Sequence, residues 1–551
     1  MKNKMIIYQV FTRLFGNDKT ACIPYGSKTE NGCGHFADFT QKALTEIQKL
    51  GATHIWYTGV IAHATQTDYT SYGIPSDHPA IVKGKAGSPY AIKDYYDVDP
   101  DLATKPEKRM KEFQNLIYRT HDAGLKVIID FVPNHVARQY QSASRPEGVK
   151  DLGEEDDQNL SFSPQNNFYY IPGHPFHPDF DLQGCAPVPY EECPAKATGN
   201  DNFSPSPGRN DWYETIKLNY GIDYCNGGGR HFDPIPSTWF KMRDILLFWA
   251  GKGIDGFRCD MAEMVPVEFW EWAIPQIKCH YPSLVFIAEV YNPNEYRNYI
   301  YKGGFDYLYD KVGLYDTLRG VVCGYASARQ ITGCWQSVDD IKDRMLNFLE
   351  NHDEQRLASD FFAGNAEKGR PALLVSACMG RNPMMIYFGQ ELGERGMDAE
   401  GFSGKDGRTT IFDYWHVDTI RRWRNKGKFD TDKLTAQELA LQAFYTQVLR
   451  LCNKERALRE GDFYDLMYAN NGSDLFNRRQ RQMCIRDSLL IVLANFEDSE
   501  KHTAVNLPHH LFEFFQIQEK GEIIATELLS GDKECITFNA NQCVLTDIPA
   551  Y

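Results

Sequence analysis

Three acidic residues and one arginine stand out because each carboxyl follows a short apolar run. Arg258 and Asp260 lie two positions apart in GFRCDMAEM (256–264), Glu289 ends the run LVFIAE, and Asp353 follows FLENH. In a strand, the side-chain period of two places Arg258 and Asp260 on one face. A buried arginine and aspartate are costly to desolvate. We therefore expect this pair to serve a function.

Two carboxyls on opposite sides of a pocket are the groups that cleave glycosidic bonds. The cation of Arg258 favours the ionised form of Asp260, as a nucleophile requires. Glu289 follows the apolar residues 285–288, and an apolar setting favours the protonated form that a general acid requires. A single aspartate at a strand end often only caps the next helix. Three acidic residues after different apolar runs favour a shared catalytic site.

Eight apolar runs alternate with amphipathic stretches and position these residues. Helices are expected near 40–50, 106–123, 237–251 and 266–279. This alternation predicts a (β/α)8 barrel, whose active site lies at the C-terminal ends of the strands. An open doubly wound sheet is the alternative, but it usually has fewer strands and often a glycine-rich phosphate loop, which we do not find. The eight runs are MIIYQV, THIWYTGV, KVIIDFV, IDGFRCD, LVFIAEV, FDYLY, a segment near 346–351 and PMMIYFG.

One connection and the end of the chain depart from this alternation. About 100 residues rich in Pro, Gly, Asn and aromatics separate the third strand from the helix near 237, and loops of that length are usually functional or form a small domain. Segments after about 455 are β-rich without a helical period. We expect a catalytic barrel from 1–135 and 237–455, an inserted domain from 136–236, and a C-terminal antiparallel β-domain from 456–551.

Composition and charge exclude several partners. The chain has 551 residues, 42% of them hydrophobic, and a formal net charge of −15 without any basic block. Nucleic acids and anionic membranes are therefore not expected partners. Neither a signal peptide nor a membrane span is evident, and the 14 cysteines are scattered. We expect a cytoplasmic protein, or a secreted or periplasmic one if a leader has been removed.

Four segments resemble the conserved regions of the α-amylase family, glycoside hydrolase family 13. They are DFVPNH (130–135), GFRCDMAEM, FIAEV (286–290) and FLENHD (348–353). SPYAIKDYYDVDP (88–100), TIKLN (215–219) and PMMIYFGQELG (383–393) resemble further family segments. The resemblance covers nearly the whole chain in the correct order.

The resemblance implies Asp260 as nucleophile and Glu289 as acid/base. It implies that Asp353 binds sugar hydroxyls and favours the distorted, oxocarbenium-like ring. The α-configuration is then retained through a covalent glycosyl-enzyme, for which the two carboxyls stand about 5–5.5 Å apart. The implied supporting residues are Arg258 holding Asp260, Asp130 bracing Arg258, His135 and His352 hydrogen-bonding the sugar, and Tyr90 stacking on its apolar face.

Departures from the family pattern concern calcium and the acceptor side. Many α-amylases carry Lys-His after the nucleophile, where this chain has Glu263 and Met264. The charge of Glu263 is expected to alter the acceptor subsite. Asn134 is retained and could ligate calcium, which prefers oxygen, whereas Cys33 and His35 poorly replace the aspartates of a second calcium loop. We expect no required cofactor and leave a structural calcium open.

Substrate and reaction type stay open within the family. TIKLN is closer to the form in neopullulanase-like and cyclodextrin-cleaving members than to that of typical α-amylases, but it does not settle the linkage. A transglycosylase would pass the same intermediate to a sugar. A catalytically silent carbohydrate-binding subunit usually lacks one of the carboxyls, and a metal-dependent barrel hydrolase would need histidines at ligand spacing. We expect an enzyme acting on starch-like or maltooligosaccharide substrates.

The segment QMCIRDS (482–488) looks foreign to its surroundings. It interrupts an expected hairpin, and a widely used transposon-derived sequencing adapter translates in one frame to Met-Cys-Ile-Arg-Asp. We hypothesise an assembly artefact, which resequencing of the source DNA by a second method tests. Cys484 is therefore left out of every argument.

Overall fold

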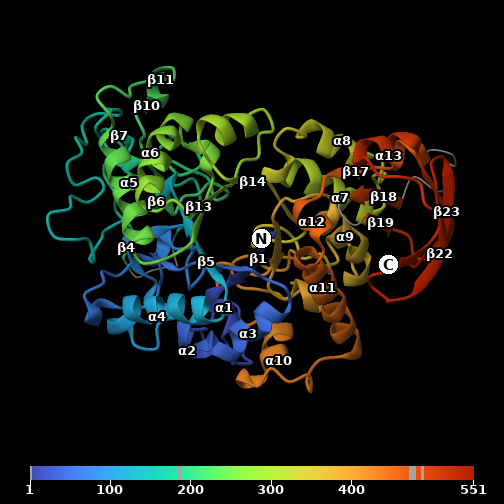
Figure 1. Cartoon of the computed structure of the whole chain (residues 1–551). Coiled ribbons are helices and arrows are strands. Elements are labelled where there is room, and N and C mark those ends of the chain that lie inside the picture. Colours follow the sequence, from blue (N-terminus) through green and yellow to red (C-terminus); the bar gives the residue numbers. More distant parts are fainter. Residues whose placement is uncertain (1–2, 183–187, 471–479, 486–488, 551) are drawn as a thin grey trace.

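A closed barrel of eight parallel strands forms the centre of the molecule. The structure, a computed structural model, describes residues 3–182, 188–470, 480–485 and 489–550 (Figure 1). Each expected apolar run overlaps one barrel strand, so the predicted (β/α)8 barrel is confirmed. In their order around the barrel the strands are β1 (Ile6–Phe11), β16 (Met384–Tyr387), β15 (Met345–Phe348), β14 (Tyr307–Tyr309), β13 (Val285–Ala288), β12 (Gly256–Cys259), β5 (Lys126–Phe131) and β2 (His54–Thr58).

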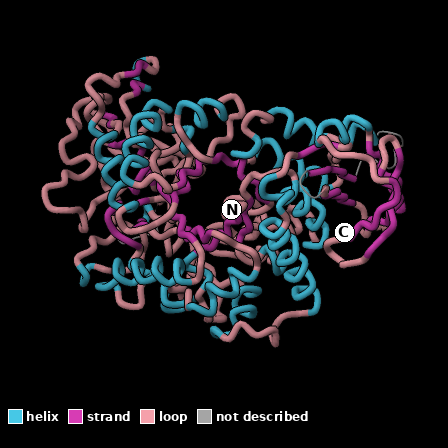
Figure 2. Tube along the Cα trace, viewed as in Figure 1, coloured by secondary structure: helices cyan, strands magenta, loops and turns pink. Residues whose placement is uncertain are grey.

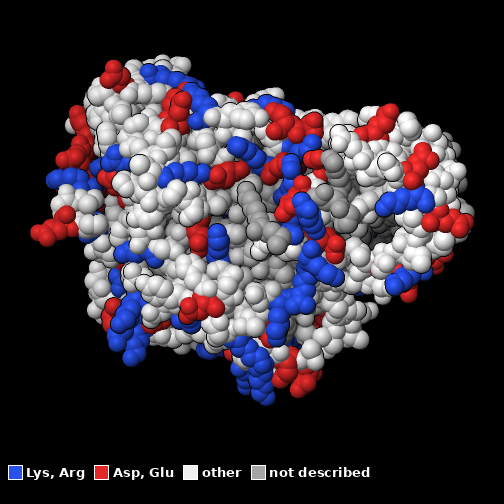
Figure 3. Space-filling view, viewed as in Figure 1, with Lys and Arg blue, Asp and Glu red and all other residues white. Residues whose placement is uncertain are grey.

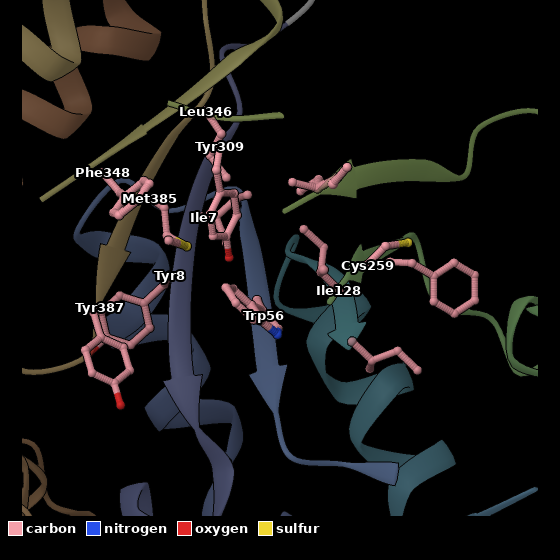
Figure 4. Close-up of a cluster of buried hydrophobic side chains, with 14 of the residues drawn as sticks. Ile7, Tyr8, Trp56, Ile128, Cys259, Tyr309, Leu346, Phe348, Met385 and Tyr387 are labelled. Atoms are coloured by element: carbon pink, nitrogen blue, oxygen red, sulfur yellow. The ribbon is translucent and has the colours of Figure 1, made fainter. Parts of the chain in front are cut away.

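The strands are apolar on both faces because both are covered. All six residues of β1 are buried, as expected for a parallel strand between a packed interior and outer helices. Figure 2 shows the strands as a ring with helices around it. Side chains from several strands fill the interior, including Ile7, Trp56, Ile128 and Leu346 (Figure 4). The barrel is therefore a packed core, and chemistry is confined to its rim.

The helices lie where the amphipathic stretches predict them. They include α3 (Gln41–Lys49), α4 (Arg109–Asp122), α5 (Ser237–Ala250) and α6 (Val267–His280). The Thr40 hydroxyl accepts the backbone N–H of Ala43 and so caps α3, which satisfies one of the unpaired donors at a helix start. Later strands are followed by α7 (Asp316–Cys323), α8 (Gln330–Ser337) and α9 (Arg370–Cys378).

Small antiparallel ladders occupy the long connection between β5 and α5. β6 (His135–Ala137) pairs with β9 (Thr215–Lys217), β7 (Tyr170–Ile171) with β8 (Ala195–Lys196), and β10 (Ile222–Asp223) with β11 (Gly229–Arg230). Outside this connection, β3 (Ile61–His63) pairs with β4 (Ile92–Val98). Figure 1 places β7, β10 and β11 on the side of the barrel opposite to the C-terminal strands. The domain boundaries at 135/136 and 236/237 stay a prediction.

Antiparallel pairing also dominates the end of the chain, after the long helix α11 (Ala436–Lys454). The boundary at 455/456 likewise stays a prediction. Helix α13 (His509–Phe515) packs Leu511 and Phe515 into a buried apolar cluster that is separate from the barrel core. The pairs are β17 (Phe463–Asp465) and β19 (Leu490–Asn495) on either side of β18 (Gln480–Ile485), β20 (Lys501–Leu507) with β23 (Gln542–Ile548), and β21 (Gly521–Thr526) with β22 (Lys533–Phe538).

The expected interruption at QMCIRDS is wrong for its first four residues. Residues 482–485 belong to β18 and keep a continuous register with β19, from Gln482 opposite Leu493 to Ile485 opposite Leu490. Residues 486–488 lie outside the described part of the chain. The hypothesis about the origin of this segment stays a prediction.

Lysines and arginines are interspersed with aspartates and glutamates over the face drawn in Figure 3. This mixing agrees with the absence of a basic block in the sequence. Within the described ranges, no helix is both long and apolar enough to cross a membrane.

Candidate active site

Strand register brings the acidic residues to one end of the barrel. On the two strands beside β12, Arg258 lies opposite Asp130 of β5 and Ile287 of β13. The ladder continues one residue further, because the N–H of Asp260 donates to Phe131 O at 2.9 Å and that of Glu289 donates to Cys259 O at 3.1 Å. Asp260 and Glu289 therefore leave adjacent strands at the same level.

One guanidinium bridges the two expected catalytic carboxyls. Nη1 of Arg258 lies 2.7 Å from Oδ1 of Asp260, and Nη2 lies 2.7 Å from Oε2 of Glu289. Nε donates to the hydroxyl of Tyr309 at 3.2 Å, and Oδ1 of Asp130 is 3.5 Å from Nη1. Arg258 is 1% exposed. The expected contact between Arg258 and Asp260 is present, and the guanidinium lies equally close to Glu289.

Aromatic side chains enclose this arginine. The rings of Trp56, Tyr90 and Tyr309 have their centroids 5.3–5.5 Å from its guanidinium carbon. Trp56 also donates from Nε1 to Oδ2 of Asp130 at 2.9 Å. Burial raises the pKa of Asp130 to about 6, although Arg258 and this indole lower it. The expected bracing of Arg258 by Asp130 is thus a long contact, and Asp130 is itself held by Trp56.

The apolar setting expected for Glu289 is wrong. Its carboxyl has polar partners on both oxygens: Oε2 accepts the backbone N–H of Met261 at 2.8 Å in addition to the Arg258 contact, and Oε1 accepts the hydroxyl of Tyr291 at 2.6 Å. The apolar residues of β13 face the barrel core and the outer helices instead. An apolar run predicts a buried strand, but it does not predict the environment of the residue that follows the strand, which can be polar.

The expected lowering of the Asp260 pKa by Arg258 is outweighed. Burial raises the pKa of Asp260 well above its ordinary value, Arg258 opposes this rise, and the charge of Glu289 adds to it. The negative charge of Glu289 thus opposes ionisation of Asp260, and the cation of Arg258 favours it.

Asp353 is the most accessible of the three carboxyls, with 41% of its side chain exposed. Oδ2 lies 3.1 Å from Nε2 of His352, and its backbone carbonyl accepts Nε of Arg408 at 2.6 Å. Desolvation within the site and the charge of Glu289 raise the pKa of Asp353 to about 7, against the lowering effects of Arg258 and Arg408. This carboxyl is open to a ligand.

His352 and Tyr90 form a stacked pair beside Asp353. Their ring centroids are 5.1 Å apart, and Tyr90 Oη is 2.5 Å from Nε2 of His352. Nε2 of Gln9 lies 2.9 Å from Nδ1 of the same imidazole. Burial and Arg258 lower the pKa of His352 well below its ordinary value, so the ring is neutral. Because the Gln9 amide donates to Nδ1, the ring proton is on Nε2, facing Tyr90 and Asp353.

His135 lies in β6 and is 3% exposed. Its Nδ1 is 3.1 Å from Nδ2 of Asn134, and its ring centroid is 5.1 Å from that of Trp212. Burial and the charge of Lys217 lower the pKa of His135 to about 3. Among the described residues, none of these contacts reaches the three carboxyls. The sugar-binding role of His135 stays a prediction.

The surroundings of Asn134 do not fit a calcium ion. Its Oδ1 accepts a hydrogen bond from Nζ of Lys217 at 2.8 Å, and the same ammonium lies 2.5 Å from Oδ1 of Asp201. Burial lowers the pKa of Lys217, with Asp201 opposing. The oxygens that a cation would use are thus occupied by a buried ammonium. In the early loop, Sγ of Cys33 donates to backbone carbonyls, and no group of three or more His, Cys, Asp or Glu that could hold a metal ion occurs in the described ranges.

The carboxylate of Glu263, which was expected to alter the acceptor subsite, is instead hydrogen-bonded to the backbone of a neighbouring loop. Its Oε2 accepts the backbone N–H groups of Tyr291 at 3.1 Å and of Asn292 at 3.0 Å. The residue that departs from the family pattern therefore holds the loop after β13. This contact could not be read from the sequence, because the two segments are 28 residues apart.

Several residues of the site were missed at the level of sequence. Trp56 and Tyr309 belong to barrel strands and have the character of ordinary core aromatics, whereas in the structure both rings lie against the guanidinium of Arg258. Tyr291 lies two residues after Glu289, so the side-chain period of two in extended backbone could have placed both side chains on the same face. Gln9, near the end of β1, is a further residue of the site that the sequence analysis did not identify. The only indication in the sequence is that it is a polar residue within an apolar run.

Comparisons with known proteins agree with this architecture. A family model described as the catalytic domain of α-amylase matches residues 9–180. α-Amylase 3 of Dictyoglomus thermophilum is 25% identical over 394 residues, which cover 68% of this chain and 68% of that protein. Neopullulanase 2 of Thermoactinomyces vulgaris is 21% identical over 476 residues, covering 83% and 64%. The crystal structure of an α-amylase from Geobacillus thermoleovorans superposes with a TM-score of 0.63 at 17% identity, covering 100% and 97%.

The parallel barrel and these similarities define a glycoside hydrolase. The chain is similar to the α-amylase family in sequence over residues 9–180 and in fold over its length, and these similarities indicate an amylase-type enzyme, of a class that acts on α-glucans.

Proposed function

We propose that this enzyme hydrolyses α-glucosidic bonds in starch-like or maltooligosaccharide substrates with retention of the α-configuration. The observation that carries the proposal is the placement of Asp260 and Glu289 on adjacent strand ends with one guanidinium between them. Asp353, from a third strand end, supplies the open carboxyl beside them.

In the first step, Asp260 attacks the anomeric carbon. Arg258 holds Oδ1 of Asp260 at 2.7 Å, which leaves Oδ2 to form the bond. As the bond from this oxygen to C1 forms, the bond from C1 to the glycosidic oxygen breaks, and Glu289 gives that oxygen its proton. Asp353 binds the sugar hydroxyls, and Tyr90 and His352 line the same subsite.

In the second step, water displaces Asp260 from the anomeric carbon. The ionised Glu289 takes a proton from water, the water oxygen bonds to C1, and the bond to Asp260 breaks. Two displacements on the same carbon return the α-configuration. A transglycosylase would follow the same course with a sugar hydroxyl in place of water.

Product analysis on maltoheptaose, soluble starch, pullulan and cyclodextrin tests the proposal. The expected result is cleavage that yields α-anomeric products in early NMR spectra and that is lost in Asp260→Asn. Asp339→Asn, at an exposed carboxyl paired with Lys342, is the matched control and retains the activity. The ranking of substrates distinguishes an amylase from a neopullulanase-like or cyclodextrin-cleaving enzyme.

Three outcomes contradict parts of the proposal. Products of β-configuration refute the retaining mechanism. Products longer than the substrate favour a transglycosylase. A folded protein without turnover on any α-glucan favours the remote alternative of a silent carbohydrate-binding subunit, although all three carboxyls are present.

The remaining expectations form part of the same proposal. We infer no required cofactor, supported by the Lys217 ammonium at Asn134. The barrel, inserted and C-terminal domains are assigned as in the sequence analysis, supported by the small ladders in the long connection and the antiparallel pairs after β16. Cytoplasmic action, without nucleic acid or membrane partners, is inferred from sequence charge and composition.

A further inference from the structure

The two oxygens of Glu289 have different partners. Oε2 lies 2.7 Å from Nη2 of Arg258 and accepts the backbone N–H of Met261. Oε1 accepts the hydroxyl of Tyr291 at 2.6 Å. A proton on Oε2 would face the fixed backbone N–H of Met261 and the positive charge of Arg258, whereas the hydroxyl of Tyr291 can rotate. The proton that Glu289 transfers must therefore be carried on Oε1, next to Tyr291.

The hydroxyl of Tyr291 is available to donate to Oε1 once Glu289 is charged. Burial and the charges of Glu289 and Asp353 raise the pKa of Tyr291 well above its ordinary value. The phenol consequently keeps its proton. When Glu289 becomes charged after giving up its own proton, this hydroxyl is already aimed at the oxygen that carries the charge.

Glu263 fixes the loop that carries Tyr291. Its Oε2 accepts two successive backbone N–H groups, those of Tyr291 and Asn292. The turn that carries Glu263 is itself fixed, because the hydroxyl of Tyr299 contacts the carbonyls of Glu263 and Val265 at 3.1 and 2.8 Å. The loops after β12 and β13 are thus tied together on both sides of Glu289.

We propose that Tyr291 is a positioning residue that holds Oε1 of Glu289 for proton transfer, and that Glu263 anchors Tyr291. The inference rests on the proposed function, since it assigns Glu289 as the acid/base. As the proton on Oε1 passes to the glycosidic oxygen and the bond from C1 to that oxygen breaks, the new carboxylate receives the Tyr291 hydrogen bond. This support is needed only where the leaving group requires a proton.

Leaving-group dependence tests the role of Tyr291. Kinetics of Tyr291→Phe are compared on maltoheptaose, whose leaving oxygen needs a proton, and on α-maltosyl fluoride, whose fluoride leaves without one. We expect kcat/KM to fall about tenfold on maltoheptaose, as for loss of a hydrogen bond to a charged group, with little change on the fluoride. Tyr118→Phe, which removes an exposed phenol on α4, is the matched control and changes neither.

Two variants of Glu263 test the anchor. Glu263→Gln keeps a carbonyl oxygen that can accept both N–H groups, so its kinetics are expected to follow the wild type. Glu263→Leu removes the acceptor and is expected to reproduce the selective loss seen in Tyr291→Phe. Equal behaviour of the Gln and Leu variants would overturn the anchoring role.

The outcomes separate this inference from the proposed function. A fall of equal size on both substrates in Tyr291→Phe indicates general damage and refutes positioning, as does no fall on either. If the wild-type protein cleaves neither substrate, the proposed function itself fails. If the wild type cleaves both and Tyr291→Phe matches it, only the inference about Tyr291 fails.

Discussion

Replacement of Arg258 by methionine is the most demanding test of the site geometry. The side chain is 1% exposed and its guanidinium lies 2.7 Å from both Asp260 and Glu289. Methionine fills much of the volume but leaves these carboxyls, and the nearby Asp130, without a cation. Breaking a buried ion pair by removing one partner costs about 3–5 kcal/mol. We expect a loss of about 4 kcal/mol in the free energy of unfolding.

The loss depends on pH with a definite sign. The pKa of Asp260 is already raised in the folded protein by burial, and removal of Arg258 raises it further. A carboxyl whose pKa is higher in the folded state stabilises that state fully below its unfolded pKa, and this contribution is lost as pH rises. The deficit of Arg258→Met relative to the wild type is therefore smaller at pH 5 than at pH 8.

Thermal unfolding at these two pH values provides the assay. A barrel of about 350 residues gains roughly 0.7 kcal/mol/K of entropy on unfolding, so a 4 kcal/mol loss lowers Tm by about 5–6 °C at pH 8. Arg138→Met is the control, because Arg138 pairs with one buried carboxyl, Glu192, away from the site. Arg258→Lys cannot reach both carboxyls at once and should be inactive on maltoheptaose. A deficit in Arg258→Met that is equal at both pH values would refute the reasoning.

Three further predictions follow from buried polar contacts. Lys217→Met removes the donor to Oδ1 of Asn134 and the cation beside Asp201, and should lower the unfolding free energy by about 2 kcal/mol. EDTA should leave the wild-type Tm and activity unchanged. A wild-type Tm that EDTA lowers and calcium restores would contradict this. Trp56→Phe removes the donor to Asp130 and should lower the free energy of unfolding, measured with urea, by about 1–3 kcal/mol. An unchanged urea concentration at the unfolding midpoint would show that this hydrogen bond does not stabilise the protein. Burial and Arg13 lower the pKa of His63 to about 4 in the folded protein. As pH falls from 6.5 to 4, His63 therefore gains a proton in the unfolded chain before it does so in the folded one, and the free energy of unfolding falls by up to about 3 kcal/mol. His63→Gln should flatten the dependence of Tm on pH in that interval, and an unchanged slope would exclude His63 as its source.

The barrel could be predicted because its signal is local. Each strand is a short apolar run, buried on both faces, and each helix is an amphipathic stretch of ordinary length. The pairing of Arg258 with Asp260 follows from a spacing of two, which is also a local property. Such features need no knowledge of which strand lies beside which.

The electrostatics of the site could not be predicted because they depend on register between strands. Glu289 follows four apolar residues, yet Arg258, Met261 and Tyr291 supply its partners. Only the alignment of β12 with β13 shows that one guanidinium reaches both carboxyls. The hydrogen bond that Lys217 donates to Asn134 depends likewise on a return of the chain from the long connection.

The closure of the barrel has a consequence for how the protein is made. β1 pairs with β16, and Ile6 lies opposite Met384, so the first strand of the barrel cannot complete its pairing until the last barrel strand has been synthesised. At about 5–20 residues per second, that wait lasts roughly 20–75 s on the ribosome. Throughout it, β1 exposes on one side the unpaired backbone N–H and C=O groups of a mostly apolar strand, which can pair with another nascent chain. Yield in a cell should therefore depend on translation rate and on chaperones that shield the first strand, more than on the stability of the finished enzyme.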